Sequence, residues 1–352
     1  MAGSSLGRAT GTWKGGSCVL LAVVLLLLSA SSVPVHGAGT VQFGDARAID
    51  PTGSAPLNVL AADLDNDGDQ DALITSYDNG WAKWYTNEDG KGTFSEATFF
   101  SEETAGAIGI AVGDLDGDGF GDVVVASQLG NKFTWFKNLN GEAFSVGVDI
   151  ETDVHGATDI KLADIDGDGH LDVIAVLRYD DRVMWYRNAD GGGIFEAGLN
   201  ISTTSTGAYA LAVADIDGDG SLDVVSASLF GELEWFKNSN GSFSLGVVLE
   251  PQTSPMGFLD VVTADFDGDG NIDVVSASYD GTGFIEGRLM MFMNGGAGSF
   301  EEGQNIDLLD STRSVAAVDL DNDGDFDLVV GDDVGGRVVW YENDGHGGPG
   351  GR

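Results

Sequence analysis

Short apolar segments rich in β-branched and aromatic residues recur along the chain, and turns rich in Gly, Asn and Asp separate them. A representative unit begins with the segment IKLAD, crosses an acidic loop and enters the β-branched run VIAV. An aromatic segment follows, VMWYRN in this unit, and then come a Gly-rich turn, a Phe and a fourth segment. Four short strands joined by turns are the pattern of one blade of a β-propeller.

This unit occurs six times at a nearly constant spacing. Its acidic loops begin at residues 63, 114, 164, 215, 265 and 319, so successive starts lie 51, 50, 51, 50 and 54 residues apart. A regular period without an intervening linker indicates one repeat domain rather than two separate domains. We therefore predict an all-β fold, a β-propeller of six four-stranded blades, over residues 39–344.

The two ends of the repeat array complement each other. The last unit ends at VVWYEN without a fourth strand, whereas Val41–Ile49 has the pattern of a fourth strand that lacks its first three. Pairing Val41–Ile49 with the strand at Val338–Tyr341 would close the ring and leave no sheet edge exposed at the seam. Residues 345–352 are rich in Gly and are predicted to be a disordered tail.

Each acidic loop follows the pattern D-x-D-x-D-G-x-x-D. Carboxylates this close repel by about 1 kcal/mol per pair even at the dielectric of water, which indicates a bound cation. The Asp side chains at positions 1, 3, 5 and 9 and the carbonyl of position 7 can form an all-oxygen shell, which favours Ca²⁺. Gly at position 6 permits the sharp turn. An EF-hand is excluded in the third loop because position 12 is Ala175, within a β-branched run.

The loops together predict binding of about six Ca²⁺ ions. The predicted ligands, with position 7 contributing its backbone carbonyl, are Asp63, Asp65, Asp67, Asp69, Asp71, Asp114, Asp116, Asp118, Phe120, Asp122, Asp164, Asp166, Asp168, His170, Asp172, Asp215, Asp217, Asp219, Ser221, Asp223, Asp265, Asp267, Asp269, Asn271, Asp273, Asp319, Asp321, Asp323, Asp325 and Asp327.

The repeated loop between two strands resembles the FG-GAP and VCBS repeats, a family that includes the propeller of the integrin α-subunits. The resemblance covers about Gly39 to Asn343. It implies a β-propeller with calcium in loops on one face and a role in adhesion or ligand binding. Integrin propellers have seven blades, so seven is the alternative to the six units counted here.

Charge excludes some classes of partner. The chain has 16 basic and 57 acidic residues and a formal net charge of −41. Such a surface repels nucleic acid and anionic lipid, so we expect neither as a partner.

The N-terminal segment predicts export. Arg8 and Lys14 precede an apolar run from Cys18 to Leu28, and small residues follow between Ala30 and Ala38. This is the pattern of a secretory signal peptide over residues 1–38, which leaves no membrane insertion after its removal. The alternative is an uncleaved membrane anchor. Cys18 is the only cysteine, so the mature domain has no disulfide and calcium is its expected stabiliser.

Candidate ligand-binding residues lie where the repeat is broken. Five units carry a charged residue three positions before the repeated Trp or its replacement, whereas the first unit has Trp81, which we expect to be exposed. The third unit contains LRYDDR and the fifth has an insertion around SYDGTGFIEGRLM. The candidates are Trp81, Arg178, Tyr179, Arg182, Phe284 and Arg288, and the sequons predict glycosylation at Asn200 and Asn240.

An enzyme is not expected. The mature domain has no Cys nucleophile and no G-x-S-x-G elbow, and only His155 lies outside the signal region, the tail and the acidic loops. We expect a monomeric, secreted calcium-binding module for an extracellular glycan or protein. One alternative is a polysaccharide lyase or hydrolase, which an axial pocket lined by Arg, Tyr and carboxylates would favour. The other is a scaffold without a ligand, which would show a polar face without exposed aromatic groups.

Overall fold

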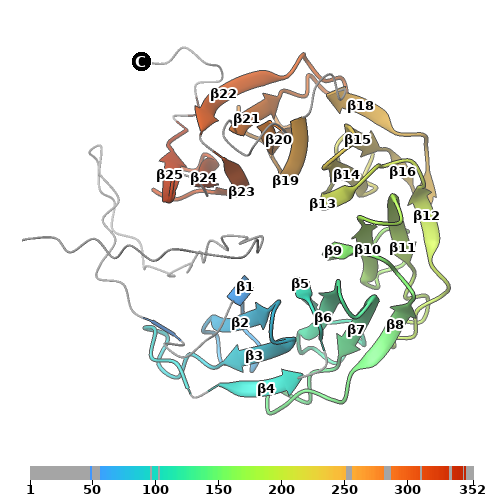
Figure 1. Cartoon of the computed structure of the whole chain (residues 1–352), viewed down its shortest axis with the longest axis vertical. Coiled ribbons are helices and arrows are strands. Elements are labelled where there is room, and N and C mark those ends of the chain that lie inside the picture. The colour runs from blue at the N-terminus through green and yellow to red at the C-terminus, as the bar shows by residue number, and fades with distance from the viewer. Residues whose placement is uncertain are drawn as a thin grey trace, which may run out of the picture.

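The computed structural model describes residues 48–49, 56–95, 97–101, 104–250, 256–280, 287–309, 311–332, 335–343 and 345. These residues form six antiparallel sheets around a common axis, each an up-and-down meander (Figure 1). The predicted six-bladed all-β propeller is confirmed. Five blades have four strands in the described residues, and the sixth has three.

The strands follow the repeat. Blade 1 contains β1 (Pro56–Ala62), β2 (Asp71–Ser76), β3 (Trp81–Tyr85) and β4 (Thr98–Ser101), and blade 2 contains β5 (Ala107–Gly113), β6 (Asp122–Ser127), β7 (Lys132–Phe136) and β8 (Val148–Thr152). Blade 3 contains β9 (Ala157–Ala163), β10 (Asp172–Leu177), β11 (Arg182–Tyr186) and β12 (Leu199–Ser202), and blade 4 contains β13 (Ala208–Ala214), β14 (Asp223–Ser228), β15 (Leu233–Phe236) and β18 (Val247–Glu250). Blade 5 contains β19 (Met256–Ala264), β20 (Asp273–Asp280), β21 (Gly287–Phe292) and β22 (Gln304–Leu309), and blade 6 contains β23 (Thr312–Val318), β24 (Asp327–Asp332) and β25 (Arg337–Tyr341). A two-stranded hairpin, β16 (Asn238–Ser239) with β17 (Ser242–Phe243), extends blade 4.

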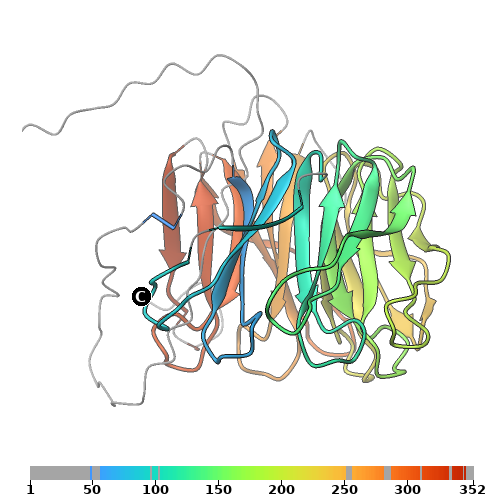
Figure 2. The same cartoon turned by 90° about the horizontal axis from the view of Figure 1, so that it is seen from below.

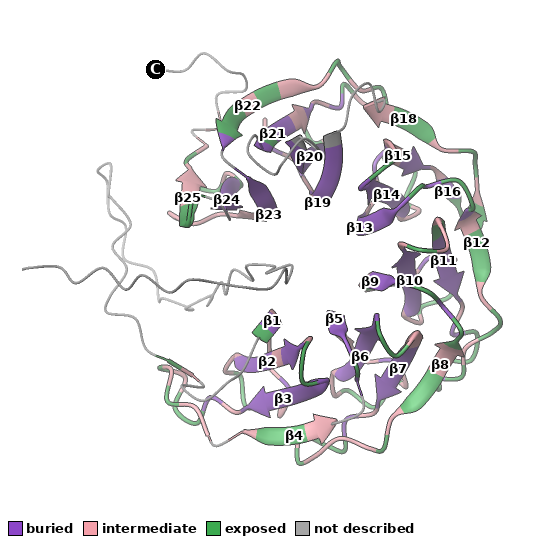
Figure 3. Ribbon diagram, in the orientation of Figure 1, coloured by how far each residue is buried: buried purple, intermediate pink, exposed green. Residues whose placement is uncertain are grey.

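Burial increases from the rim of the propeller toward the middle of each blade. The second strands, such as β6 with the sequence DVVVAS, are buried along their whole length. The outermost strands are half exposed, as the green and pink outer ring of Figure 3 shows. The β-branched runs therefore form the strands that are covered on both sides, and the polar sequences form the rim.

The hydrophobic core lies between blades rather than within them. Five clusters of buried side chains each join two successive blades, from blades 1 and 2 to blades 5 and 6. The repeated Trp of one blade meets a Phe of the next edge to face, with ring centroids 5.7–6.5 Å apart. Trp84, Trp135, Trp185 and Trp235 therefore pack neighbouring blades against one another.

One turn glycine is required by this packing. Gly193 has a positive φ of 72° and lies against the indole of Trp135, where an added Cβ would be 2.2 Å from the ring. A side chain at this position would push blades 2 and 3 apart.

The meander places two kinds of loop on opposite faces. The acidic loops join the first strand of each blade to the second, and short turns join the second strand to the third. Because neighbouring strands are antiparallel, these connections lie at opposite ends of each blade, which Figure 2 shows from the side. The acidic loops thus share one face, and the turns between second and third strands, termed the hairpin tips below, share the other.

Several predictions fall outside the described residues. They are the signal peptide at residues 1–38, the closing strand at Val41–Ile49 apart from its last two residues, the tail beyond residue 345 and the ligand candidate Phe284. Within the described ranges, no helix is long and apolar enough to cross a membrane.

Candidate metal centres

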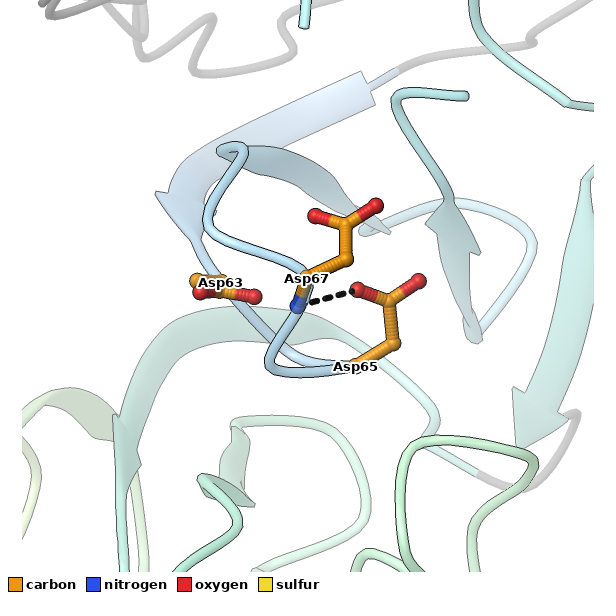
Figure 4. Close-up of side chains that lie close together, drawn as sticks. All are labelled: Asp63, Asp65 and Asp67. Atoms are coloured by element: carbon orange, nitrogen blue, oxygen red, sulfur yellow. Dashed lines mark hydrogen bonds between the residues drawn. The ribbon is translucent and has the colours of Figure 1, made fainter. Parts of the chain in front are cut away.

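Each acidic loop folds around its first carboxylate. In blade 3, Asp164 accepts hydrogen bonds from the backbone N–H groups of Gly167, Asp168 and Gly169 at 2.8, 3.1 and 2.8 Å. Asp168 in turn accepts one from the N–H of His170 at 3.0 Å. The loop therefore reverses direction with its carboxylates gathered on the inside. Figure 4 shows the corresponding loop of blade 1, where Asp63, Asp65 and Asp67 converge.

Two positions in every loop adopt left-handed backbone conformations. Position 6 is the predicted Gly, with φ of 90° at Gly169. Position 4 also has positive φ, 73° at Gly167 and 60° at Asn66. Position 4 is always Gly or Asn, the residue types that tolerate this conformation. Only the Gly at position 6 was predicted from the sequence, although the restriction to Gly or Asn at position 4 is visible in all six loops.

The Asp at position 9 lies at the base of each loop and is almost fully buried. In blade 4, one oxygen of Asp223 accepts the backbone N–H of Ile216 at 3.2 Å and the indole N–H of Trp235 at 3.1 Å. Its other oxygen accepts the backbone N–H of Asn238 at 2.7 Å. Burial raises the pKa of this carboxyl, and of Asp122 and Asp273, to about 6. Position 9 therefore ties the loop to the blade besides being a predicted ligand.

The donor set fits a hard divalent cation. Carboxylate oxygens from three Asp residues approach within 4.8 Å of one another in the loops of blades 1 to 5. The groups contain positions 1, 3 and 5 in blades 1 and 5, and positions 1, 3 and 9 in blades 2, 3 and 4. One oxygen of each of Asp63, Asp116, Asp166 and Asp217 is buried without a hydrogen-bond donor. Such oxygens are costly to bury unless a cation or water satisfies them. The carbonyl ligands predicted at position 7 remain a prediction.

Three of the six loops contain a basic side chain of the protein itself. Lys137 in blade 2 pairs with Asp116 and Asp118, Arg187 in blade 3 pairs with Asp166 and Asp168, and Lys237 in blade 4 pairs with Asp217 and Asp219. The residues at the same position of blades 1, 5 and 6 are Thr86, Met293 and Glu342.

The pKa values of the loop carboxyls differ between the loops that contain a basic side chain and those that do not. Burial and the neighbouring charge of Asp67 raise the pKa of Asp65 in blade 1. Burial also opposes ionisation of Asp118 in blade 2, but the hydrogen bonds from Lys137 and from the N–H of Phe120, together with the charge of Lys137, outweigh it and lower the pKa of Asp118. The loops of blades 2, 3 and 4 therefore have less uncompensated negative charge for a cation than the other three.

Replacing the basic residue should strengthen cation binding in its loop. A monovalent and a divalent cation 4 Å apart repel by about 2 kcal/mol even at the dielectric of water, so we expect Lys237→Met to tighten Ca²⁺ binding in blade 4 by roughly tenfold. Calorimetric titration should then show one more tight site. Lys132→Met is the matched control, because Lys132 pairs with Asp149 at 2.9 Å and not with a loop. An unchanged number of tight sites would show that Lys237 does not compete with the cation.

An Asn at the end of the third strand connects neighbouring blades in blades 2 to 6, a role that was not predicted from the sequence. In blade 4 the side-chain amide of Asn238 donates to the carbonyl of Ile165 in blade 3 at 2.7 Å and to Leu222 at 2.9 Å. Its side-chain oxygen accepts the N–H of Gly241 at 2.8 Å. The blades 2, 3, 5 and 6 repeat the bond to the preceding loop through Asn138, Asn188, Asn294 and Asn343. The sequence feature that could have indicated this role is the Asn that ends all six aromatic segments.

The predicted ligand-binding residues differ in their exposure to solvent. Trp81 is only 8% exposed and packs beneath the ammonium of Lys83, 4.2 Å from its ring, so the expectation of an exposed Trp is wrong. It is wrong because β3 is buried along its whole length, its first residue included. Arg182 and Arg288 are exposed at the starts of β11 and β21, and Arg178 lies beside Tyr179. The sequon residues Asn200 and Asn240 are both exposed.

A polar cavity of about 190 Å³ lies on the propeller axis, lined by the innermost strands of all six blades. It contains Asp159 and Lys161 from β9, Asp260 from β19 and Arg313 from β23. Asp159 accepts the N–H of Leu211 in β13, and Asp260 accepts that of Val315 in β23, at 3.0 and 2.9 Å. Lys161 donates to Asp159 at 3.1 Å. These groups join the inner strands to one another.

Comparison with known proteins agrees with this architecture. The FG-GAP-like repeat matches the chain over residues 63–125, 114–175, 164–226, 215–276 and 265–330, so that each match starts at the first Asp of an acidic loop. No curated protein sequence matches the chain.

Several solved structures are similar to the chain at low sequence identity, and one of them has a TM-score above 0.5. A lectin of Agrocybe aegerita that recognises non-reducing terminal N-acetylglucosamine is 21% identical, with a TM-score of 0.55 over 82% of this chain and 80% of the lectin. The biofilm matrix protein Bap1 of V. cholerae is 21% identical, with a TM-score of 0.44 over 72% of this chain and 39% of its own. A chain of a nidogen/laminin complex is 12% identical, with a TM-score of 0.48 over 76% and 88%. Because the repeat matches together extend from residue 63 to residue 330, the chain belongs to the FG-GAP-like repeat family.

Proposed function

We propose that this protein is a secreted, calcium-stabilised module that binds a glycan outside the cell and has no catalytic activity. The observation that carries the glycan assignment is a row of large exposed side chains at the hairpin tips. Leu129, Tyr179 and Phe230 occupy the same place in blades 2, 3 and 4 and are 61%, 62% and 54% exposed. Exposed apolar and aromatic groups gathered on one face of an acidic protein are typical of a binding surface.

Two further features support the proposal. The Agrocybe aegerita lectin shows that a propeller of this architecture can present a site for a terminal sugar. The N-terminal segment has the pattern of a signal peptide, and the absence of Cys after Cys18 leaves calcium as the expected stabiliser in an oxidising, calcium-rich exterior. A scaffold without a ligand is disfavoured, because the hairpin-tip face carries exposed aromatic groups.

The axial cavity is the one observation that favours a second candidate, an enzyme of extracellular polysaccharide. It combines Arg313 and Tyr209 with the carboxylates of Asp159 and Asp260. However, both carboxylates already accept backbone N–H groups from neighbouring blades. An adjoining cavity of about 760 Å³ shares Lys161 and Asp260 with this one, but its lining is mainly aliphatic and contains neither Arg nor Tyr. This geometry is better suited to holding the inner strands together than to accommodating a sugar chain.

Binding to a glycan array in the presence of Ca²⁺ tests the proposal. We expect the domain from residue 39 onward to retain a defined set of glycans in Ca²⁺ and to lose them in chelator, because the blades that hold the hairpin tips are stabilised by the loops on the opposite face. The bound oligosaccharides should be recovered unshortened by mass spectrometry. Retention of no glycan in saturating Ca²⁺ would refute the binding function, and shortened products would favour the enzyme.

A further inference from the structure

The side chain of Arg178 lies among three aromatic rings contributed by two blades. Its guanidinium carbon is 5.4 Å from the ring centroid of Tyr179, 5.7 Å from that of Tyr209 and 5.9 Å from that of Phe230. Tyr179 and Arg178 belong to the hairpin tip of blade 3, Phe230 to the tip of blade 4, and Tyr209 to β13. Cations within about 6 Å of a ring centroid are attracted to its π-face, so the rings hold the guanidinium in place.

Arg178 has no acidic partner among the described residues, which is unusual in a chain with a formal charge of −41. Its Nε is buried and has no hydrogen-bond acceptor. The two acids that follow it in sequence are engaged elsewhere. Asp180 accepts the backbone N–H of His155 at 2.8 Å, and Asp181 accepts that of Gly207 at 2.7 Å. The guanidinium therefore has a charge and at least one N–H donor that the fold leaves unsatisfied.

The rings around Arg178 are held rigidly although two of them are exposed. The ring of Tyr179 lies over Gly156 and the ring of Phe230 lies over Gly207, and an added Cβ on either glycine would be 2.7 or 2.8 Å from the ring. Both glycines have positive φ, 74° and 69°. Each aromatic residue thus rests on the backbone of its own blade and presents the rest of its surface to solvent.

The cluster continues into the axial cavity. Tyr209 is almost fully buried, contacts Arg178 on one side and lines the cavity on the other. Lys161 and Arg313 line the same cavity together with Asp159 and Asp260, so the charges there are balanced. A ligand on the hairpin-tip face at this point would therefore meet exposed rings and an arginine without an acidic partner.

We propose that Arg178, Tyr179 and Phe230 form a binding site for a hexuronate unit of an acidic polysaccharide. The guanidinium would pair with the sugar carboxylate, since its planar donors match a carboxylate in bidentate geometry. The exposed rings would stack against the apolar face of the pyranose. This inference rests on the proposed glycan-binding function and assigns it a site and a class of sugar.

The test is titration calorimetry with trigalacturonate in saturating Ca²⁺, with its methyl ester as the matched uncharged ligand. We expect the acid to bind and the ester to bind at least tenfold more weakly. Arg178→Gln should reduce affinity for the acid at least tenfold, and Phe230→Ala and Tyr179→Ala severalfold each. Lys132→Gln is the control for loss of a positive charge at the start of a third strand, since Lys132 pairs with Asp149 on blade 2. Leu245→Ala, at a residue 93% exposed on blade 4, is the control for loss of an apolar side chain. Both controls should bind like the unmodified protein.

Each contrary result has a distinct meaning. Equal affinity for the acid and the ester would overturn the recognition of a carboxylate, and normal binding by Arg178→Gln would overturn the site. Binding of other glycans on the array without binding of trigalacturonate would refute this inference and leave the proposed function in place. Thermal unfolding of each variant separates loss of binding from loss of fold, and the exposure of Tyr179 and Phe230 makes a folding defect in their Ala variants unexpected.

Discussion

Removal of Ca²⁺ by a chelator should lower the melting temperature of the domain by about 9 °C. At roughly ten times a Kd of 10⁻⁴ to 10⁻³ M, each of the three loops without a basic residue adds about 1.4 kcal/mol by mass action. The weaker loops of blades 2, 3 and 4 add about 1 kcal/mol together, so the total is about 5 kcal/mol. A domain of roughly 300 residues has an unfolding entropy near 0.6 kcal/mol per degree, which converts this free energy to about 9 °C. Differential scanning calorimetry with and without chelator measures the shift.

The structure explains why the loops depend on a cation. Without one, the loops gather several carboxylates, and four of their buried oxygens have no donor. The buried Asp122, Asp223 and Asp273 have pKa values raised to about 6, above the ordinary value of about 3.9. The folded metal-free protein thus keeps protons that the unfolded chain has lost, so its stability falls as pH rises from about 4 to about 6. The chelator should therefore have a larger effect at pH 7.5 than at pH 5.

Two controls separate a bound ion from simple screening. Sodium chloride at the ionic strength of the calcium buffer should restore little of the lost stability, because screening acts on exposed charges rather than on the buried oxygens. Magnesium should restore less than calcium, since it demands a smaller and more regular shell. Equal melting temperatures in calcium and chelator would refute a structural metal at these loops.

The blades and loops could be predicted from sequence because their determinants are local. Nine consecutive residues specify each acidic loop, and hydrophobic alternation over about ten more specifies the strands that flank it. A Trp at the position of Trp84 recurs in five of the six units, with Met291 in the fifth, and such recurrence is typical of packing. In each case the interacting residue types recur in most units, so the period itself carried the information.

The remaining features depend on contacts between distant residues. The side chain of Asn238 donates to a carbonyl 73 residues earlier. The recurrence of Asn at the end of the aromatic segments is visible in the sequence, but the residue that it contacts is not. The three rings around Arg178 come from residues 179, 209 and 230, and only the first stood beside it in the sequence. Trp81 was misjudged because an irregular residue was assumed to be exposed, whereas it is buried and lies under Lys83. A residue that departs from the repeat indicates a changed contact, but it does not show whether that contact is with solvent or with the interior of the protein.

The second prediction concerns the Asn at the end of the third strand. Asn238→Ala should lower the free energy of unfolding by about 3–5 kcal/mol, because each buried group left without its hydrogen bond costs about 1–3 kcal/mol. The substitution removes the partners of two carbonyls and one N–H, those of Ile165, Leu222 and Gly241, at a site with no solvent exposure. Urea unfolding monitored by tryptophan fluorescence measures the loss.

Matched variants show whether the contact between blades is responsible. Ser239→Ala changes the exposed neighbouring residue and should have little effect. Asn238→Asp preserves the acceptor for Gly241 but removes both donors and buries a charge, so it should be at least as destabilising as Ala. Asn343→Ala removes the equivalent bond to Phe266 in the half-buried last blade and should cost less than Asn238→Ala.

A loss below about 1 kcal/mol for Asn238→Ala would mean that water replaces the amide. The loops would then be joined to the preceding blades mainly by the Trp–Phe packing. A loss of the expected size would show that each acidic loop is stabilised by the blade that follows it as well as by its cation. Calcium bound in one blade would then also stabilise the next, because the carbonyl that Asn238 holds belongs to the second residue of the blade 3 loop, directly after its first ligand, Asp164.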